Sequence, residues 1–205
     1  MSPRLWCFLL FAIVLLAPAV FADPVIVNYD FGAVQIACSN GYAYQGPMLS
    51  CPYTGPTQNF NDSPGFGWTL GSIGSGLTGP NTVFFPPPFT GLPFTQAVFL
   101  QGGHNPSVSQ AVGGFTAGSY ILSFYLGSRY RNGCCDGNQT VMALIDGNVI
   151  GTWVLASYTP FTLVTAPFSV TSGGSHTLKF VGMHQGDHTA FLSYVVITPN
   201  PAPER

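Results

Sequence analysis

The residues best suited to binding chemistry gather in one stretch of the chain, between Gly127 and Asn138. Arg129, Tyr130 and Arg131 are consecutive there. An arginine offers a planar fork of hydrogen-bond donors and a tyrosine offers a flat aromatic face, a combination that suits the hydroxyl groups and ring faces of sugars. Two other roles stay open at this stage. Arg129 could pair with an aspartate, and Tyr130 could pack on a sheet.

A second polar stretch, residues 184–188, ends in Asp187 and His188. A carboxylate and an imidazole can bind a metal or exchange protons. In a turn between two strands, however, such residues are more typical of a polar loop. We therefore count Asp187 and His188 as ligand-binding donors and acceptors, and we predict neither a metal nor a cofactor.

Catalytic signatures are weak. The only glutamate is Glu204, at the end of the chain, so a paired-carboxylate mechanism would have to use aspartates alone. The stretch from Gly74 to Gly79 matches a dinucleotide-binding fingerprint by letter, but Pro80 follows where a helix should begin, and we interpret the match as chance. We predict that the protein is not an enzyme. A hydrolase would need Asp187, His188 and a further aspartate in one cleft.

Charge is scarce along the whole chain, with 5 Lys and Arg and 7 Asp and Glu in 205 residues. No basic run could neutralise several phosphates, which excludes nucleic acid as a partner. A surface built from serine, threonine, asparagine, glutamine and glycine suits neutral partners, sugars among them.

The first 22 residues are typical of an export signal. Arg4 precedes an apolar run that is too short to span a bilayer comfortably, and small residues follow at a plausible cleavage site before Asp23. We therefore predict a secreted, extracellular protein with no stable membrane anchor in the mature chain. Its domains would be a signal peptide (1–22), one β-sandwich (23–198) and a disordered tail (199–205).

Four cysteines remain after cleavage: Cys38, Cys51, Cys134 and Cys135. An even number in an exported chain predicts disulfides. A bridge between the adjacent Cys134 and Cys135 would be strained. This favours two bridges from the Cys38 and Cys51 region to the loop that carries Arg129. A Cys38–Cys51 bridge beside a reduced or vicinal pair is the alternative.

The elements that must position these residues are short strands separated by Gly, Pro, Asn and Ser turns. In the segment 119–126, Tyr120, Leu122, Phe124 and Leu126 share one face, which is the period of a strand with one buried side. The predicted strands are 25–31, 97–100, 108–112, 119–126, 140–145, 149–155, 161–170, 176–182 and 189–197. Their number and spacing predict a single all-β domain, an antiparallel β-sandwich. The segment 32–93 looks irregular, and the Asp146-Gly-Asn motif predicts a hairpin turn.

Several motifs, taken in order, carry a resemblance to a known class of domain. They are Phe99-Leu-Gln-Gly, Val108-Ser-Gln-Ala-Val, Ala117-Gly-Ser-Tyr-Ile-Leu-Ser-Phe, Gly174-Ser-His-Thr-Leu-Lys-Phe-Val-Gly and Gly186-Asp-His-Thr-Ala-Phe. Together they resemble the galactose-binding-like jelly-roll sandwiches of exported bacterial proteins, many with a PEP-CTERM sorting tail. They are more distantly similar to plant cell-wall proteins with a domain of unknown function. The resemblance implies a jelly-roll fold.

Two departures from that class matter. Carboxylates that help to hold a structural calcium in related carbohydrate-binding modules correspond here to Gly32 and Ser193, which makes an inherited calcium site doubtful. The sorting tail is also missing, so the resemblance implies a secreted product or an incomplete gene sequence rather than an anchored protein.

Aromatic residues offer further candidates for binding. We expect Trp153 to pack in a strand and Trp68 to pack in the sandwich. The run Phe84-Phe-Pro-Pro-Pro-Phe89 is apolar, and it would form either an exposed partner patch or a loop that covers the core.

The sequence thus predicts a secreted, non-catalytic module that binds carbohydrate or a cell-surface polymer through its end loops. The expected ligand-binding residues are Arg129, Tyr130, Arg131, Asp187 and His188. The alternatives are a structural or adhesive matrix protein that binds protein partners and, less favoured, a polysaccharide hydrolase.

Overall fold

The computed structural model describes residues 23–46, 59–71, 74–84, 86–102, 105–130 and 138–200. Several predictions fall outside these residues: the signal peptide, the role of Arg131, and three of the four cysteines, Cys51, Cys134 and Cys135. Within the described residues, no helix is long and apolar enough to cross a membrane.

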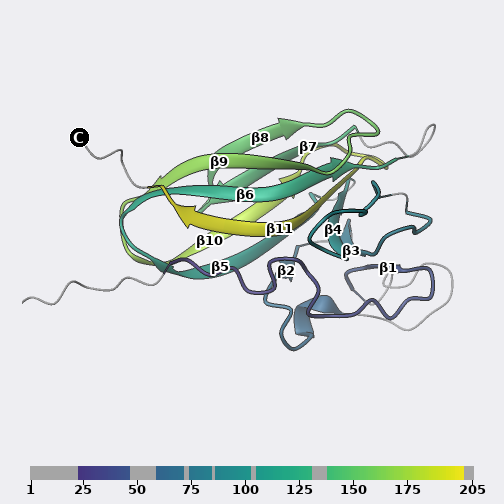
Figure 1. Ribbon diagram of the computed structural model, residues 1–205, viewed down its shortest axis with the longest axis horizontal. Coiled ribbons are helices and arrows are strands. Elements are labelled where there is room, and N and C mark those ends of the chain that lie inside the picture. The colour runs from purple at the N-terminus through teal and green to yellow at the C-terminus, as the bar shows by residue number, and fades with distance from the viewer. Residues whose placement is uncertain are drawn as a thin grey trace, which may run out of the picture.

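Two antiparallel sheets pack face to face (Figure 1). The first sheet has the order β1 (Tyr42–Tyr44), β3 (Ser75–Thr78), β4 (Ala97–Gln101), β11 (Thr189–Pro199), β6 (Gly118–Ser128) and β9 (Thr162–Val170). The second has the order β2 (Thr69–Leu70), β5 (Ser107–Phe115), β10 (Gly174–Gly182), β7 (Thr140–Ile145) and β8 (Asn148–Val154). A short 3-10 helix, η1 (Phe60–Asp62), precedes β2. The predicted all-β antiparallel sandwich is confirmed.

The main core lies between the two sheets, because alternate side chains of each long strand point inward. In β6 the predicted inward residues are buried, whereas Ser123 and Tyr125 on the other face are only half-buried. Phe124 of the first sheet meets Phe180 of the second with ring centroids 4.8 Å apart. Each of these fully buried rings stabilises the fold by about 1.5–3 kcal/mol.

The β7–β8 hairpin confirms the predicted turn. Asp146 and Gly147 take positive φ angles of 48° and 82°. A glycine and a short polar residue tolerate this conformation, which matches the twist of the flanking strands.

A second, aromatic core covers the outer face of the first sheet. Residues 80–84 and 86–96 fold over β4 and β11, and Phe84 and Phe89 become buried against Phe99 and Phe191. The centroids of Phe84 and Phe99 are 4.4 Å apart. The expected alternative of an exposed patch at Phe84 and Phe89 is therefore wrong, because the outward faces of β4 and β11 carry large rings that this loop must cover.

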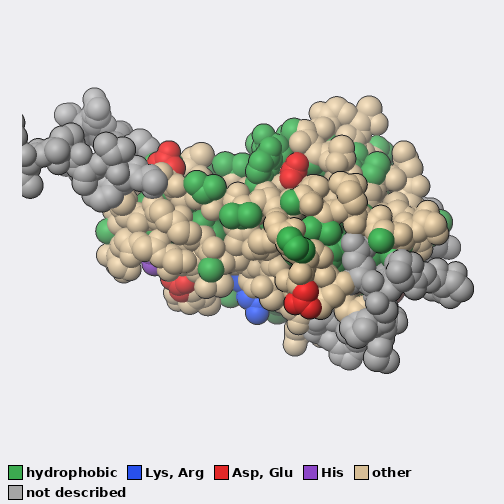
Figure 2. Space-filling view, turned by 90° about the horizontal axis from the view of Figure 1, so that it is seen from below, with side chains coloured by type: hydrophobic (Ala, Val, Ile, Leu, Met, Phe, Trp, Pro, Cys, Tyr) green, Lys and Arg blue, Asp and Glu red, His purple; other side chains and the backbone are tan. Residues whose placement is uncertain are grey.

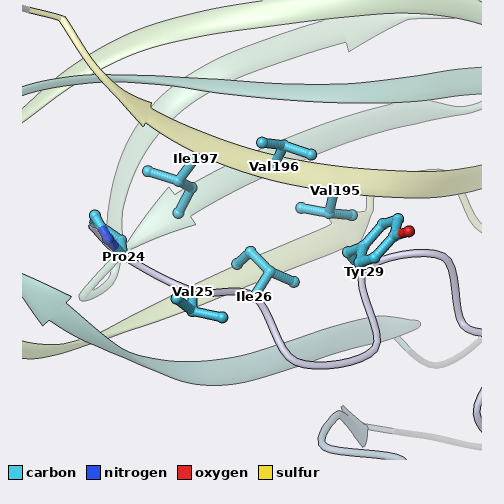
Figure 3. A pocket seen from close by; sticks show the side chains of 7 residues that line it. All are labelled: Pro24, Val25, Ile26, Tyr29, Val195, Val196 and Ile197. Carbon is cyan, nitrogen blue, oxygen red and sulfur yellow. The ribbon is translucent and has the colours of Figure 1, made fainter. Parts of the chain in front are cut away.

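The predicted first strand, 25–31, is not a strand. Asn28 and Phe31 adopt left-handed backbone conformations with φ of 51° and 58°, which no continuous strand allows. The segment nevertheless lies where a strand would, because the Gln110 side chain of β5 bonds both the N–H and the C=O of Val27, at 2.8 Å and 2.9 Å. On its other side, the Val195 N–H of β11 donates to the Tyr29 carbonyl at 2.8 Å (Figure 3).

The described part of the segment expected to be irregular, 32–93, contains the short strands β1, β2 and β3 and the helix η1. Trp68 packs as predicted: it is buried, and its indole N–H donates to the Asn28 carbonyl at 3.0 Å. Trp153 also packs in the sandwich, edge-on to Phe124 at 5.0 Å. At the other end, β11 continues through Pro199, one residue past the expected domain boundary.

Gly32 and Ser193, the two positions without the expected carboxylates, form hydrogen bonds within the protein instead. The Ser193 hydroxyl is buried and donates to the Gln96 carbonyl at 2.8 Å. The Gly32 N–H donates to the Asp30 carboxylate at 3.0 Å. No group of three or more His, Cys, Asp or Glu side chains among the described residues could hold a metal ion.

Candidate functional site

The described members of the predicted site meet at one end of the sandwich, on the right in Figure 1. Arg129 and Tyr130 directly follow β6, and Asp187 and His188 directly precede β11. Because β6 and β11 are antiparallel neighbours, the end of one strand lies beside the start of the other. The pairing thus brings together two stretches that are 58 residues apart in sequence.

Arg129 and Asp187 form a direct ion pair. The Nη1 atom of Arg129 lies 2.7 Å from the Oδ1 atom of Asp187. Arg129 is only 4% exposed, and its guanidinium carbon lies 4.2 Å from the centroid of the Phe84 ring. Its Nε–H donates to the Phe84 carbonyl at 3.2 Å. Arg129 therefore forms the ion pair with an aspartate, and its contact with a ligand stays a prediction.

Asp187 is braced on a second side by residues that the sequence did not single out. Gln101, at the end of β4, donates from its side-chain amide to the same Oδ1 atom. The Tyr44 hydroxyl of β1 donates to the Gln101 side-chain carbonyl. Burial raises the pKa of Tyr44 well above its usual range, so this hydroxyl stays protonated as a donor. The side chain of Asp187 is still 36% exposed.

Tyr130 stands outside this network and is 50% exposed. Its ring meets that of Tyr158, in the β8–β9 loop, edge to face at 4.9 Å and 89°. Tyr158 is 37% exposed and has a positive φ of 66°. The two exposed rings form a pair at this end of the sandwich, and Tyr158 is a further candidate that the sequence analysis missed.

The β8–β9 loop is tied to the end of β6 by four hydrogen bonds, one of which runs from the Ser128 N–H to the Thr159 carbonyl at 2.9 Å. The Ser128 hydroxyl donates to the Ala156 carbonyl at 2.6 Å and accepts from the Thr159 N–H at 2.9 Å. The Tyr158 N–H donates to the Arg129 carbonyl at 3.2 Å. These bonds fix the backbone that carries both exposed rings.

His188 is half-buried, and its ring lies 5.7 Å from that of His184. Gln139 braces this turn: its amide donates to the His188 carbonyl at 3.0 Å, and its side-chain carbonyl accepts from the His184 N–H at 2.7 Å. The two histidines therefore belong to an ordered polar turn beside Asp187.

Cys38 is buried, 6% exposed, in the main core. Its predicted partners lie outside the described residues, so the disulfide pairing stays a prediction.

A second ion pair lies at the opposite end of the sandwich. The Nδ1 atom of His176 is 2.5 Å from the Oδ2 atom of Asp146, and its Nε2 atom is 3.1 Å from the Ser172 carbonyl oxygen. The hydrogen bond to Asp146 raises the pKa of His176. The bond from His176 lowers the pKa of Asp146. This pair braces the β7–β8 turn against β10.

No family model matches the sequence, and no curated protein matches it either. Among solved structures, the fold is similar to that of a cyclase from Fischerella sp. TAU in complex with 4-(1H-indol-3-yl)butan-2-one. The TM-score is 0.55 at 14% identity, over 89% of this chain and all of that one. This likeness shows the fold: the chain is a β-sandwich of the same architecture.

Two carbohydrate-binding modules are also similar, with lower TM-scores. TmCBM61, in complex with β-1,4-galactotriose, has a TM-score of 0.49 at 14% identity, over 67% of this chain and 90% of that chain. The module CBM36, in complex with calcium and xylotriose, has a TM-score of 0.41 at 16% identity, over 63% of this chain and 92% of that chain.

Proposed function

We propose that the protein is a secreted, non-catalytic module that binds carbohydrate at the end of the sandwich where Arg129 meets Asp187. One observation carries the proposal. The exposed rings of Tyr130 and Tyr158 and the part-exposed carboxylate of Asp187 belong to the same group of end loops. Aromatic faces and a fixed hydrogen-bond acceptor at one end of the fold suit a sugar ligand, because a sugar ring has an apolar C–H face and an edge that carries hydroxyl groups.

The bracing of Asp187 supports this role. The Oδ1 atom accepts from Arg129 and Gln101, but a carboxylate has about four acceptor sites. The remaining sites can accept hydrogen bonds from sugar hydroxyls. Because Arg129 and Gln101 already hold the side chain in one orientation, binding costs little additional ordering.

The scarcity of charge agrees with a neutral ligand, because the chain has only 5 Lys and Arg and 7 Asp and Glu in 205 residues. Charged side chains are few and scattered over the face seen in Figure 2. Among the described residues of the candidate site, the charges on Arg129 and Asp187 neutralise each other.

The alternatives have less support. A matrix protein that binds protein partners was favoured by an exposed aromatic run, and Phe84 and Phe89 are buried. A hydrolase would need Asp187, His188 and a further aspartate in one cleft, whereas the charged partner of Asp187 is Arg129.

Secretion and disulfide formation are part of the proposal. We expect the chain to be cleaved after Ala22 and Cys38 to be oxidised. Mass spectrometry of the exported protein, with and without reduction, tests both points. An exported protein that still begins at Met1 would contradict the cleavage. A mass that does not change on reduction would contradict the disulfide.

Affinity electrophoresis of the mature, oxidised protein tests the binding function. The gels would contain xylan, β-1,4-galactan, mixed-linkage β-glucan or mannan, each with and without a chelator. We expect retardation by at least one polysaccharide and weaker retardation of Tyr130→Ala and Asp187→Asn. Val154→Ala, at a position 75% exposed on β8, is the control. Equal mobility of the wild type in every gel would refute the proposal.

A further inference from the structure

We infer that the protein carries a second carbohydrate-binding surface on the outer face of the first sheet, formed by Tyr29, Tyr125 and Tyr194. We call these three residues the tyrosine platform. The inference rests on the proposed function only for the class of ligand, because the platform is separate from the end-loop site and shares no residue with it.

The three rings form a continuous row. Tyr29 and Tyr194 meet edge to face at 5.1 Å and 89°, and Tyr194 meets Tyr125 at 6.2 Å and 79°. Tyr125 in turn packs on the buried Phe94 at 5.5 Å. The row is thus anchored in the aromatic core at one end and is exposed at the other, where Tyr29 is 43% exposed.

The backbone at Tyr194 is strained in a way that places its ring in this row. The register between β11 and β6 shifts between Ser193 and Val196, and Tyr194 has a left-handed φ of 55°. A bulky aromatic residue rarely adopts this conformation. Bulges of this kind redirect a side chain, and strain of this kind is concentrated at binding and catalytic sites.

A shallow hollow of about 170 Å³ adjoins Tyr29 (Figure 3). The N-terminal segment forms one wall, and β11 forms the other. The lining residues are uncharged: Pro24, Val25, Ile26, Tyr29, Val195, Val196 and Ile197. The hollow extends the apolar surface of the platform beyond the ring of Tyr29.

The chemistry of this surface selects a neutral, hydroxylated ligand with an apolar face. None of the three tyrosine hydroxyls hydrogen-bonds to the part of the chain that the structure describes, so each can bond a ligand. The nearest carboxylate in sequence, Asp30, accepts the N–H of Gly32 in its own turn. Rings that stack and hydroxyls that donate fit the pyranose units of an uncharged polysaccharide.

One member of the platform, Tyr194, lies on β11, the strand that begins at the end-loop site. Tyr194 is the sixth residue of β11, which places it about 17 Å along the strand from Thr189. A polysaccharide chain of several units is long enough to contact both surfaces. Two linked contacts on one polymer increase the apparent affinity well beyond that of either alone.

Affinity electrophoresis with the four polysaccharides named above tests the platform directly. Tyr29→Ala removes an exposed ring, and Tyr194→Asn removes the second ring but keeps a residue that tolerates the left-handed backbone. We expect each change to weaken polymer binding about tenfold, with an unchanged melting temperature for Tyr29→Ala. Tyr29→Phe should retain most of the binding that comes from stacking, and Val154→Ala should match the wild type.

The outcomes separate the two surfaces. Weaker binding by Tyr29→Ala and Tyr194→Asn supports the platform, even if Tyr130→Ala binds normally, in which case the proposed end-loop site fails instead. Loss of binding in Tyr130→Ala alone, with both platform variants at wild-type affinity, overturns the inference and leaves the proposed function standing. Wild-type protein that no polysaccharide retards overturns both. Self-association that Tyr29→Ala abolishes would also overturn the inference, because a second copy of the chain would then occupy this surface.

Discussion

Asp187→Asn is the most informative single change at the end-loop site, because it removes one charge and keeps the size and shape of the side chain. The Arg129 side chain is 5% exposed and that of Asp187 is 36% exposed. Deleting one partner of a fully buried ion pair costs about 3–5 kcal/mol, whereas an exposed pair contributes about 0–1 kcal/mol. One partner here is buried and the other is more than a third exposed, so we expect a loss of about 2 kcal/mol.

For a domain of this size, that loss corresponds to a fall in melting temperature of roughly 4–8 °C. The cause is the Arg129 guanidinium, which would be left buried beside Phe84 without its counter-charge. Urea unfolding followed by circular dichroism measures the free energy of unfolding of the wild type and the variant under identical conditions.

A double-mutant cycle separates this cause from a general disturbance of the loop. Arg129→Met removes the charge and retains a flexible apolar side chain. In that background, Asp187→Asn should cost less than about 0.5 kcal/mol, because no buried charge is left unpaired. The reasoning is refuted if Asp187→Asn costs the same with and without Arg129, or if it costs nothing in the wild type.

Three further predictions concern stability. Phe84→Ala should lower the free energy of unfolding by about 3–5 kcal/mol, measured by urea unfolding, because it opens the aromatic core and removes the ring beside the guanidinium; a loss below about 1 kcal/mol would contradict the packing. His176→Gln should lower the melting temperature at pH 5.5 but not at pH 9, by an amount equivalent to less than about 1 kcal/mol. The pKa of His176 is raised in the folded protein, so its stabilising contribution is fully present below the pKa of an unfolded histidine and is lost as pH rises through the folded pKa. The pKa of Asp146 is lowered, so its contribution is fully present above the pKa of an unfolded aspartate. An equal effect at both pH values would exclude this linkage. Trp68→Phe should cost about 0.5–1.5 kcal/mol, since the Asn28 carbonyl loses its indole donor but still accepts from the Phe31 N–H, and thermal denaturation without a shift would count against that bond.

The strands from Ala97 onward could be predicted from sequence because their inward faces repeat with a period of two. Phe124 and Leu178 reach the core from different sheets, yet each is recognisable from its own strand alone. The short strands β1 and β3 carry no such signal. Tyr44 pairs with Gly76, and a three-residue strand is defined by its partner rather than by its own pattern.

The first-strand prediction failed for a local reason that composition does not reveal. Residues 25–31 have strand-like side chains, but Asn28 and Phe31 turn the backbone into the left-handed region. Asparagine is compatible with that conformation, whereas a phenylalanine gives no warning of it. The side chain of Gln110 replaces the missing ladder bonds, which is a tertiary effect.

The sequence predicted some residues of the candidate site but not the contacts between them. Arg129 and Asp187 were both singled out, but their contact depends on the pairing of β6 with β11, which no local pattern fixes. Tyr44, Gln101 and Tyr158 were missed because each is an ordinary residue within its own segment. Their importance comes only from the neighbours that the fold supplies.

The docking of the N-terminal segment has a consequence for solubility. β4 pairs with the first part of β11, from Thr189 to Leu192. After Leu192, the segment 23–29 lies along the side of β11 that β4 leaves uncovered. An uncovered strand edge is a template for pairing with another chain. The seven residues that follow the predicted cleavage site would therefore protect the molecule against edge-to-edge aggregation. A chain trimmed to begin at Asp30 should self-associate as concentration rises.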